Sequence, residues 1–143
     1  DRYATGHIVS HSAQRLPSIA VSSTQEIIEK AQDAQVIGID EAQFFDLELV
    51  DVCQTLADKG KRVIIAGLDQ DYRGKPFEPI PQLLAVAEYI AKTLAICVQC
   101  GNPAGRTQRL SKDSARVVVG AADIYEARCR FCHEIYDDEG EHS

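Results

Sequence analysis

The chain has 143 residues, of which 45% are hydrophobic, and carries a formal net charge of −7 with a sequence pI of about 5.0. This length can bury one sizeable core and one small further module. The acidic balance disfavours a nucleic-acid-binding surface, which needs a basic face. No apolar run approaches a membrane span and no signal peptide is visible, so we expect neither nucleic acid nor a membrane as a partner.

The first 18 residues are polar and rich in turn formers, and we expect them to form a loop. His7 and His11 are four residues apart, a spacing that would suit a metal pair on a helix. Gly6 and the lack of apolar periodicity instead favour solvated loop histidines. The chain contains no Met and begins at Asp1, so we expect a preceding segment to be missing.

The sequence predicts alternating strands and helices over residues 19–39. Ile19–Val21 is a candidate strand. Ser23 and Glu26 have the spacing of a capping box, which predicts a helix up to about Asp33. Val36–Ile39 is a short, apolar, largely β-branched run, as is typical of a buried strand in a parallel sheet.

The alternation continues after residue 45. Asp46 can cap a second helix that ends at Gly60, with Cys53 on its apolar face as a small core residue. Arg62–Ala66 is a second buried strand. A helix from Pro81 to Ile90 and a third strand, Leu94–Cys97, complete the pattern. We therefore predict an α/β fold with a parallel sheet and helices on both of its faces.

Two adjacent carboxylates, Asp40 and Glu41, directly follow the strand at 36–39. Ligands of open α/β sheets bind just beyond the carboxyl ends of the strands. Paired acids are costly to desolvate unless they meet a metal, a cation or a reacting proton. The pair is therefore a candidate catalytic site, with a helix-capping role as the alternative.

Four of the five cysteines form two Cys-x-x-Cys knuckles, which predict a structural zinc site with four thiolates. The ligands would be Cys97, Cys100, Cys129 and Cys132. The 28 residues between the knuckles would form a long loop closed at its base by the metal. His133 is an alternative fourth ligand, and a redox dithiol is the rival interpretation.

Several motifs in this order, together with the knuckles, resemble the type II thymidine kinases. They are Asp-Glu-Ala-Gln-Phe-Phe at 40–45, Gly-Leu-Asp-Gln-Asp-Tyr-Arg-Gly-Lys-Pro-Phe at 67–77, Arg-Thr-Gln-Arg-Leu at 106–110, and Tyr125. The resemblance runs from Arg2 to about His133. It implies a RecA-like P-loop NTPase core and a zinc-binding lasso subdomain. The change in composition near Cys97 divides these into residues 1–94 and 95–143, and we expect the acidic tail at 137–143 to be disordered.

The resemblance implies transfer of the γ-phosphoryl group of ATP to the 5′-hydroxyl of thymidine. Glu41 matches the general base, and Asp40 matches the acid that holds Mg²⁺ through water. The implied ATP and metal contacts are Asp1, Arg2, Asp40, Glu41, Ala42 and Gln43. The implied nucleoside contacts are Tyr72, Arg116, Val117, Val118, Val119, Gly120 and Tyr125. For Tyr72, which matches an aromatic packed on the thymine, a half-buried loop tyrosine is the alternative.

One departure from the family is the absence of its Gly-x-x-x-x-Gly-Lys-Ser/Thr phosphate loop, which would lie before Asp1. The resemblance further implies a cytoplasmic homotetramer inhibited by thymidine triphosphate. The alternative function is a non-catalytic zinc-ribbon interaction module or an inactive kinase fragment.

Overall fold

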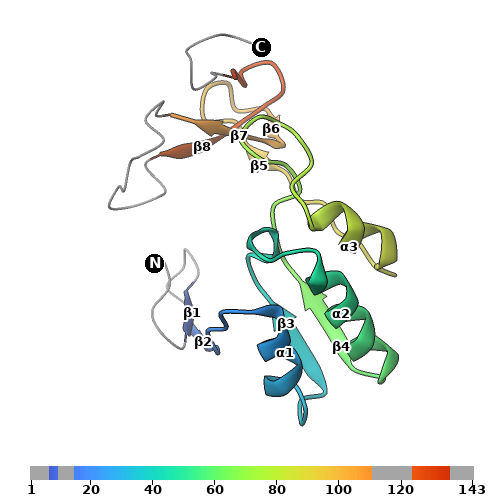
Figure 1. Ribbon diagram of the computed structural model, residues 1–143. Coiled ribbons are helices and arrows are strands. Elements are labelled where there is room, and N and C mark those ends of the chain that lie inside the picture. The colour runs from blue at the N-terminus through green and yellow to red at the C-terminus, as the bar shows by residue number, and fades with distance from the viewer. Residues whose placement is uncertain (1–6, 10–14, 111–123, 136–143) are drawn as a thin grey trace.

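The computed structural model describes residues 7–9, 15–110 and 124–135 (Figure 1). Several predicted features lie outside these residues. They are Asp1, Arg2, His11, the β-type run with the nucleoside contacts at 116–120, and the acidic tail at 137–143. Helices and a parallel strand pair form the lower body in Figure 1, and four short strands at the top flank the two cysteine knuckles.

The centre of the lower body is a pair of parallel strands, β3 (Val36–Ile39) and β4 (Arg62–Ile65). Val36 lies opposite Arg62, and Ile39 lies opposite Ile65. Helix α2 (Glu48–Asp58) connects them. Parallel strands need such a crossover, and the predicted βαβ unit is confirmed here.

Helix α1 (Thr24–Lys30) begins as the capping pattern predicted. The Ser23 hydroxyl accepts a hydrogen bond from the backbone N–H of Glu26 at 3.4 Å. The Glu26 carboxylate accepts a hydrogen bond from the Ser22 hydroxyl at 2.6 Å. The capping box predicted a bond to Ser23, one residue later. The helix ends at Lys30, slightly earlier than expected.

Helix α2 also follows its local signals. An Asp46 carboxylate oxygen accepts from the backbone N–H of Glu48 at 3.1 Å. Gly60, just past the last turn, has a φ of +86°, a left-handed conformation that glycine adopts without strain. Cys53 is buried, as predicted for a core residue, and burial raises the pKa of its thiol to about 11.

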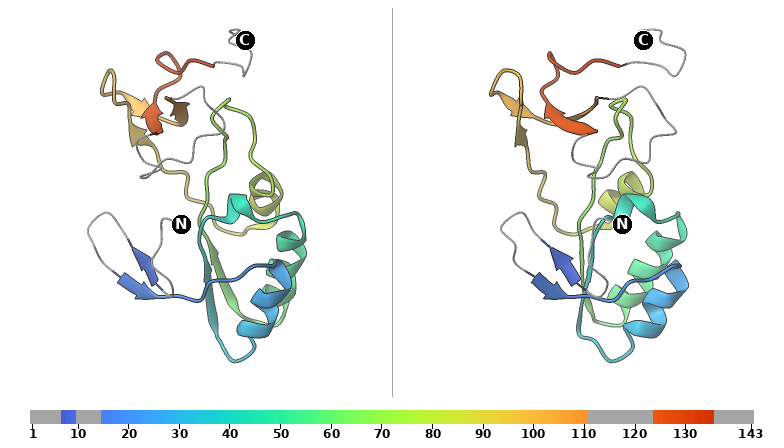
Figure 2. Two further views of the ribbon diagram at one scale, coloured as in Figure 1. Left: turned by 60° about the vertical axis from the view of Figure 1, so that its left-hand side comes forward. Right: turned by 90° about the vertical axis from the view of Figure 1, so that its left-hand side faces the viewer.

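The three helices pack into one core that uses a single face of the β3–β4 pair. Helices α1 and α2 lie on the same side of the strands in both views of Figure 2. On the opposite face, Val36 is 57% exposed and Ile64 is 51% exposed. Within the described residues, the prediction of helices on both faces is therefore wrong. The core consists of Ile27, Ala31, Ile39, Ala42, Leu49, Val52, Cys53, Leu56, Ile80 and Leu83.

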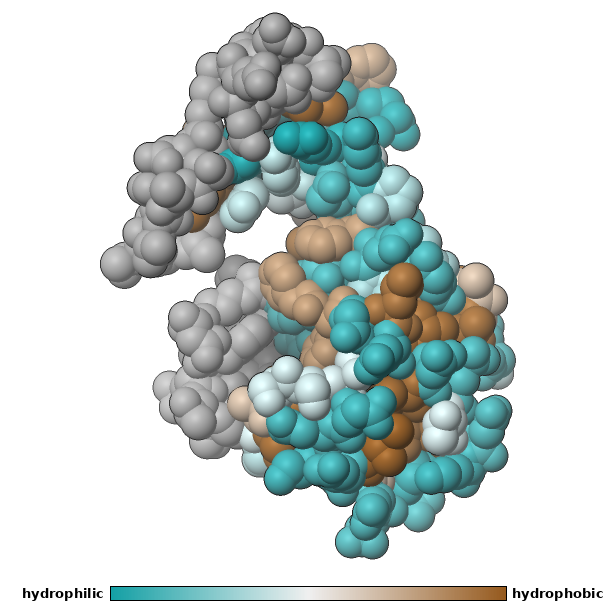
Figure 3. Space-filling view, in the orientation of Figure 1, coloured by the Kyte–Doolittle hydropathy of each residue, from teal (hydrophilic) through white to brown (hydrophobic). Residues whose placement is uncertain are grey.

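Helix α3 (Ile80–Val86) ends four residues before the predicted Ile90. It buries Ile80 and Leu83, but Tyr89 beyond its end is 92% exposed. A helix continues where it can bury an apolar face, and these later residues have no surface to pack against among the described ones. Figure 3 shows apolar residues reaching the surface of the lower body between polar ones.

The strand predicted at Leu94–Cys97 is shorter and has a different partner. Strand β5 (Ala95–Ile96) pairs antiparallel with β6 (Pro103–Ala104) and does not join the β3–β4 pair. Strands β7 (Arg106–Arg109) and β8 (Tyr125–Arg128) form a second antiparallel pair. The assignment as a third parallel strand is thus wrong, because the partner of β5 is the segment that follows the first cysteine knuckle.

The N-terminal part differs from the predicted loop. Strands β1 (His7–Val9) and β2 (Arg15–Pro17) pair antiparallel. Ile19–Val21, predicted to be a strand, is irregular and leads into α1. A strand needs a hydrogen-bonded neighbour, and among the described residues none pairs with this segment.

Candidate active site and metal centre

The acid pair lies where β3 ends, as predicted. Backbone hydrogen bonds continue just beyond the ends of β3 and β4. The Ala66 N–H donates to the Ile39 carbonyl at 2.9 Å, and the Ala42 N–H donates to the Ala66 carbonyl at 3.0 Å. Asp40 and Glu41 are half-buried. The backbone N–H of Glu41 donates to an Asp40 carboxylate oxygen at 2.8 Å.

Glu41 has an unusual backbone for a residue with a side chain. Its φ of +54° and ψ of +44° lie in the left-handed region, which non-glycine residues adopt rarely and often at functional sites. It precedes the short 3₁₀ helix η1 (Ala42–Phe44), yet its side chain makes no capping hydrogen bond. The capping alternative for Glu41 therefore finds no support.

The two residues after the pair are buried. Ala42 has no exposed surface and Gln43 is 3% exposed. The Gln43 amide donates to Glu41 Oε2 at 2.6 Å and accepts from the backbone N–H of Leu68 at 3.0 Å. Among the predicted ATP contacts that the structure describes, Asp40 and Glu41 retain exposed surface. The Gln43 amide instead uses both its nitrogen and its oxygen in hydrogen bonds to other residues of the chain.

The loop after β4 is closed by its own hydrogen bonds. One Asp71 carboxylate oxygen accepts from the backbone N–H groups of Arg73 and Lys75, at 2.9 and 3.0 Å. Gly74 donates to the Asp71 carbonyl and has a φ of +77°. The loop thereby holds Tyr72 at a defined position.

Tyr72 is half-buried and contacted by two guanidinium groups. The Arg109 Cζ lies 4.9 Å from the ring centroid, and the Arg73 Cζ lies 5.5 Å from it. Arg73 Nε also donates to the Tyr72 hydroxyl at 3.2 Å. Aromatic faces attract cations at these distances. The burial agrees with the loop-tyrosine alternative, and a role in stacking on the base stays a prediction.

The cysteine knuckles converge as predicted. The Sγ atoms of all four predicted ligands lie within 4.8 Å of one another, and those of Cys100 and Cys129 are 3.6 Å apart. Sulfurs bound tetrahedrally to zinc at about 2.3 Å would be about 3.8 Å apart. This donor set therefore fits a metal such as zinc. Four convergent sulfurs also argue against a simple redox pair.

His133 does not join this cluster. Its Nε2 lies 2.7 Å from the carbonyl oxygen of Tyr72, and the metal-ligand group comprises cysteines alone within the described residues. The alternative of His133 as fourth ligand is therefore not supported by the geometry.

Hydrogen bonds and burial shift the thiol pKa values of Cys97, Cys129 and Cys132 in opposite directions. Burial opposes ionisation of Cys97, but backbone N–H groups of both knuckles outweigh it and lower the pKa of that thiol to about 6. Backbone hydrogen bonding at Cys132 lowers the pKa of Cys129. The hydrogen bond with Cys129 and burial raise the pKa of Cys132 to about 12. The thiols cannot all ionise together without a cation, which a metal ion would supply.

Comparison with known proteins supports the resemblance to thymidine kinases. The family model described as thymidine kinase matches residues 1–133. The chain belongs to the thymidine kinase family. A protein named thymidine kinase from Rhodothermus sp. (strain ITI 518) is 57% identical over 133 residues, which are 93% of this chain and 62% of that relative. The chain thus spans less than two thirds of the length of this thymidine kinase.

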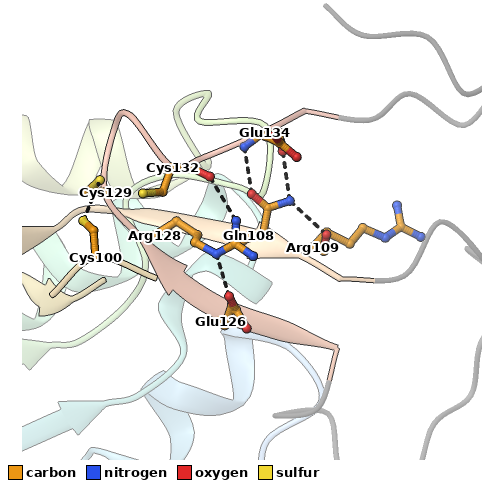
Figure 4. Close-up of polar contacts among 8 residues, drawn as sticks. All are labelled: Cys100, Gln108, Arg109, Glu126, Arg128, Cys129, Cys132 and Glu134. Atoms are coloured by element: carbon orange, nitrogen blue, oxygen red, sulfur yellow. Dashed lines mark hydrogen bonds and ion pairs between the residues drawn. The ribbon is translucent and has the colours of Figure 1, made fainter. Parts of the chain in front are cut away.

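In this thymidine kinase family member, two buried side chains bond to the backbone of the second cysteine knuckle or just after it, and neither had a role assigned from sequence (Figure 4). Gln108 donates to the Glu134 carbonyl at 3.0 Å and accepts from the Glu134 N–H at 2.8 Å. Arg128 donates to the Cys132 carbonyl at 2.9 Å and pairs with Glu126. The signal available was Gln108 inside the 106–110 family motif.

The other predicted site residues lie partly within and partly outside the described residues. Tyr125 is 41% exposed and opens β8 opposite Arg109. Asp1, Arg2 and the contacts at 116–120 lie outside the described residues. None of the helices in the described ranges has the length and apolarity needed to cross a membrane.

Proposed function

We propose that the protein is an ATP:thymidine 5′-phosphotransferase, which produces thymidine monophosphate. Membership of the thymidine kinase family supports this assignment. The observation that carries it is the half-buried pair of Asp40 and Glu41 at the carboxyl end of a parallel strand. This is where α/β folds bind their ligands.

In this proposal Glu41 accepts the proton of the 5′-hydroxyl while the hydroxyl oxygen attacks the γ-phosphorus and ADP leaves. A carboxylate within hydrogen-bond reach of the hydroxyl suits that role. Asp40 would hold Mg²⁺ through water, and the ion, when bound, would neutralise charge on the phosphates. Because Glu41 directly follows Asp40, the base would lie beside the phosphates that the ion neutralises.

The proposed nucleoside seat uses the loop after β4. Tyr72 would pack on the thymine, with Tyr125 near the sugar and the backbone of Arg116, Val117, Val118, Val119 and Gly120 reading the base. The four cysteines would hold a zinc ion, whose closed four-thiolate site leaves no position for substrate. The metal would therefore act by shaping the loop, not by taking part in the chemistry.

Glu41→Gln in the full-length protein tests the proposal. Loss of the base should lower kcat about 10²- to 10⁴-fold. Thymidine affinity, measured by calorimetry, should change little, because Gln is nearly isosteric. Glu29→Gln, an exposed acid on α1, is the matched control and should retain wild-type turnover.

Two results would count against the proposal. Near-normal kcat in Glu41→Gln would remove Glu41 from the role of base. A wild-type protein that binds neither thymidine nor its triphosphate would favour the non-catalytic zinc module. We also propose a cytoplasmic homotetramer inhibited by thymidine triphosphate, and light scattering and inhibition assays test the assembly and the inhibition.

A further inference from the structure

The Gln43 side chain has a contact pattern that a nucleotide ligand does not explain. It is 3% exposed, in a site where Asp40 and Glu41 keep exposed surface. Both ends of its amide are bound within the chain. We propose that Gln43 is a positioning residue that holds the Glu41 carboxylate and ties it to the loop after β4. This inference rests on the proposed function.

The amide has one orientation that satisfies both neighbours. Nε2 donates to Glu41 Oε2 at 2.6 Å, and Oε1 accepts from the Leu68 N–H at 3.0 Å. A flipped amide would set its NH₂ against the Leu68 N–H and its oxygen against a carboxylate oxygen. Two donors or two acceptors would then face each other, so the flipped state is disfavoured. Gln43 therefore locates the carboxylate relative to the backbone at Leu68.

The Glu41 backbone is also held on both sides. Its N–H donates to Asp40, and its carbonyl accepts from Phe44 at 3.1 Å within η1. These bonds maintain the left-handed backbone of Glu41, and the Gln43 amide then fixes the far end of the side chain. A base held by backbone and side-chain contacts keeps its position without reorganising during reaction.

Gly67 allows the loop to come this close. A Cβ at Gly67 would lie 2.8 Å from Ile80 Cδ1, 3.0 Å from Gln43 Oε1 and 3.3 Å from the Ala42 nitrogen. A side chain at this position would push against both the Gln43 amide and the Ala42 backbone, so glycine favours the close approach of the loop to the amide. This steric observation is independent of the hydrogen bonds and points to the same contact.

The contact also connects the proposed base to the proposed nucleoside seat. Leu68 begins the loop that carries Tyr72, and that loop is closed by its own hydrogen bonds. Glu41, Gln43 and Leu68 therefore form one hydrogen-bonded chain from the carboxylate to the loop. A shift of the loop would move the carboxylate with it.

Two variants of the full-length protein separate the halves of the contact. Gln43→Leu removes both hydrogen bonds. Gln43→Glu keeps an oxygen for the Leu68 N–H but replaces the donor to Glu41 with a second carboxylate. If Gln43 positions the base, both variants should lower kcat about 10²-fold with the thymidine KM changed less than about threefold. Gln25→Leu, an exposed glutamine on α1, is the control and should keep wild-type values.

Other outcomes overturn the inference. Wild-type kcat in Gln43→Glu would mean that the hydrogen bond from Gln43 to Glu41 does not position the base. An ATP KM raised at least about tenfold with kcat retained would make Gln43 a nucleotide ligand instead. Melting temperatures of both variants identify any loss of kcat that comes from unfolding.

A crystal structure of Gln43→Leu decides the positioning claim without activity. The Glu41 carboxylate should move by about 1 Å or occupy two rotamers, a displacement large enough to matter for catalysis. An unmoved carboxylate would overturn the inference. A wild-type protein that phosphorylates no thymidine would instead refute the proposed function, so the two failures are distinguishable.

Discussion

The imidazole of His133 donates a hydrogen bond from Nε2 to the carbonyl oxygen of Tyr72, over 2.7 Å. The direction follows because a carbonyl oxygen only accepts. His133 directly follows the second cysteine knuckle, and Tyr72 lies at the tip of the loop after β4. This one bond therefore links the metal centre to the loop that we propose seats the nucleoside.

His133→Ala should weaken thymidine binding while the metal stays bound. Loss of one such hydrogen bond costs about 1 kcal/mol, which corresponds to about a fivefold rise in Kd. Calorimetry measures the thymidine affinity, and elemental mass spectrometry measures the zinc content of the protein. Arg130→Ala, at an exposed position of the same knuckle, is the control. Loss of zinc in His133→Ala would show instead that the imidazole is a ligand.

Cys100→Ser should abolish metal binding and loosen the cysteine module. Structural zinc stabilises such modules by about 10 kcal/mol or more in apparent binding energy. Hydrogen exchange should become fast over β5–β8 and remain slow in α2, whose core is separate from the cysteine cluster. Cys53→Ala should retain one metal per chain, because Cys53 lies in the helical core. Equal metal content in the two variants would contradict the four-cysteine site.

Gly74→Ala should destabilise the loop that carries Tyr72. Both Gly74 and Gly101 have positive φ, and an alanine there costs about 1–2 kcal/mol in backbone strain. A Cβ at Gly74 would also meet the Arg106 guanidinium, whereas one at Gly101 has open space. Urea unfolding should thus show a larger loss for Gly74→Ala than for Gly101→Ala.

A double-mutant cycle with Arg106→Ala isolates this contact with Gly74. The extra loss in Gly74→Ala, about 0.5 kcal/mol or more, should disappear when Arg106 is truncated. A loss that stays the same in the Arg106→Ala background would assign the whole effect to backbone strain.

Stability at alkaline pH should depend on Cys53. Burial raises the pKa of its thiol from 9.0 to about 11, so folding favours the neutral form. The stabilisation is complete below pH 9 and declines as the pH rises toward 11, because the unfolded chain ionises first. Urea midpoints of the wild type should fall more steeply over this range than those of Cys53→Ala. Parallel pH profiles would contradict the burial effect.

Local patterns in the sequence were sufficient for the elements whose signals lie within one segment. The Ser23 cap starts α1, Gly60 follows α2, and the apolar runs at 36–39 and 62–65 form strands. The acid pair and the cysteine knuckles were likewise visible, because their chemistry depends on spacing alone. These features need no knowledge of distant partners.

The tertiary structure decided everything that depends on which segments meet. The partner of β5 is β6, α3 ends at Val86, and helices cover one face of the described strand pair. The bonds of Gln43 to Leu68 and of His133 to Tyr72 also join residues far apart in the chain. Strand pairing, helix ends and buried amide contacts depend on the surface that the folded chain provides. A local pattern does not contain that surface, so it predicts the groups at the site but not how they are held.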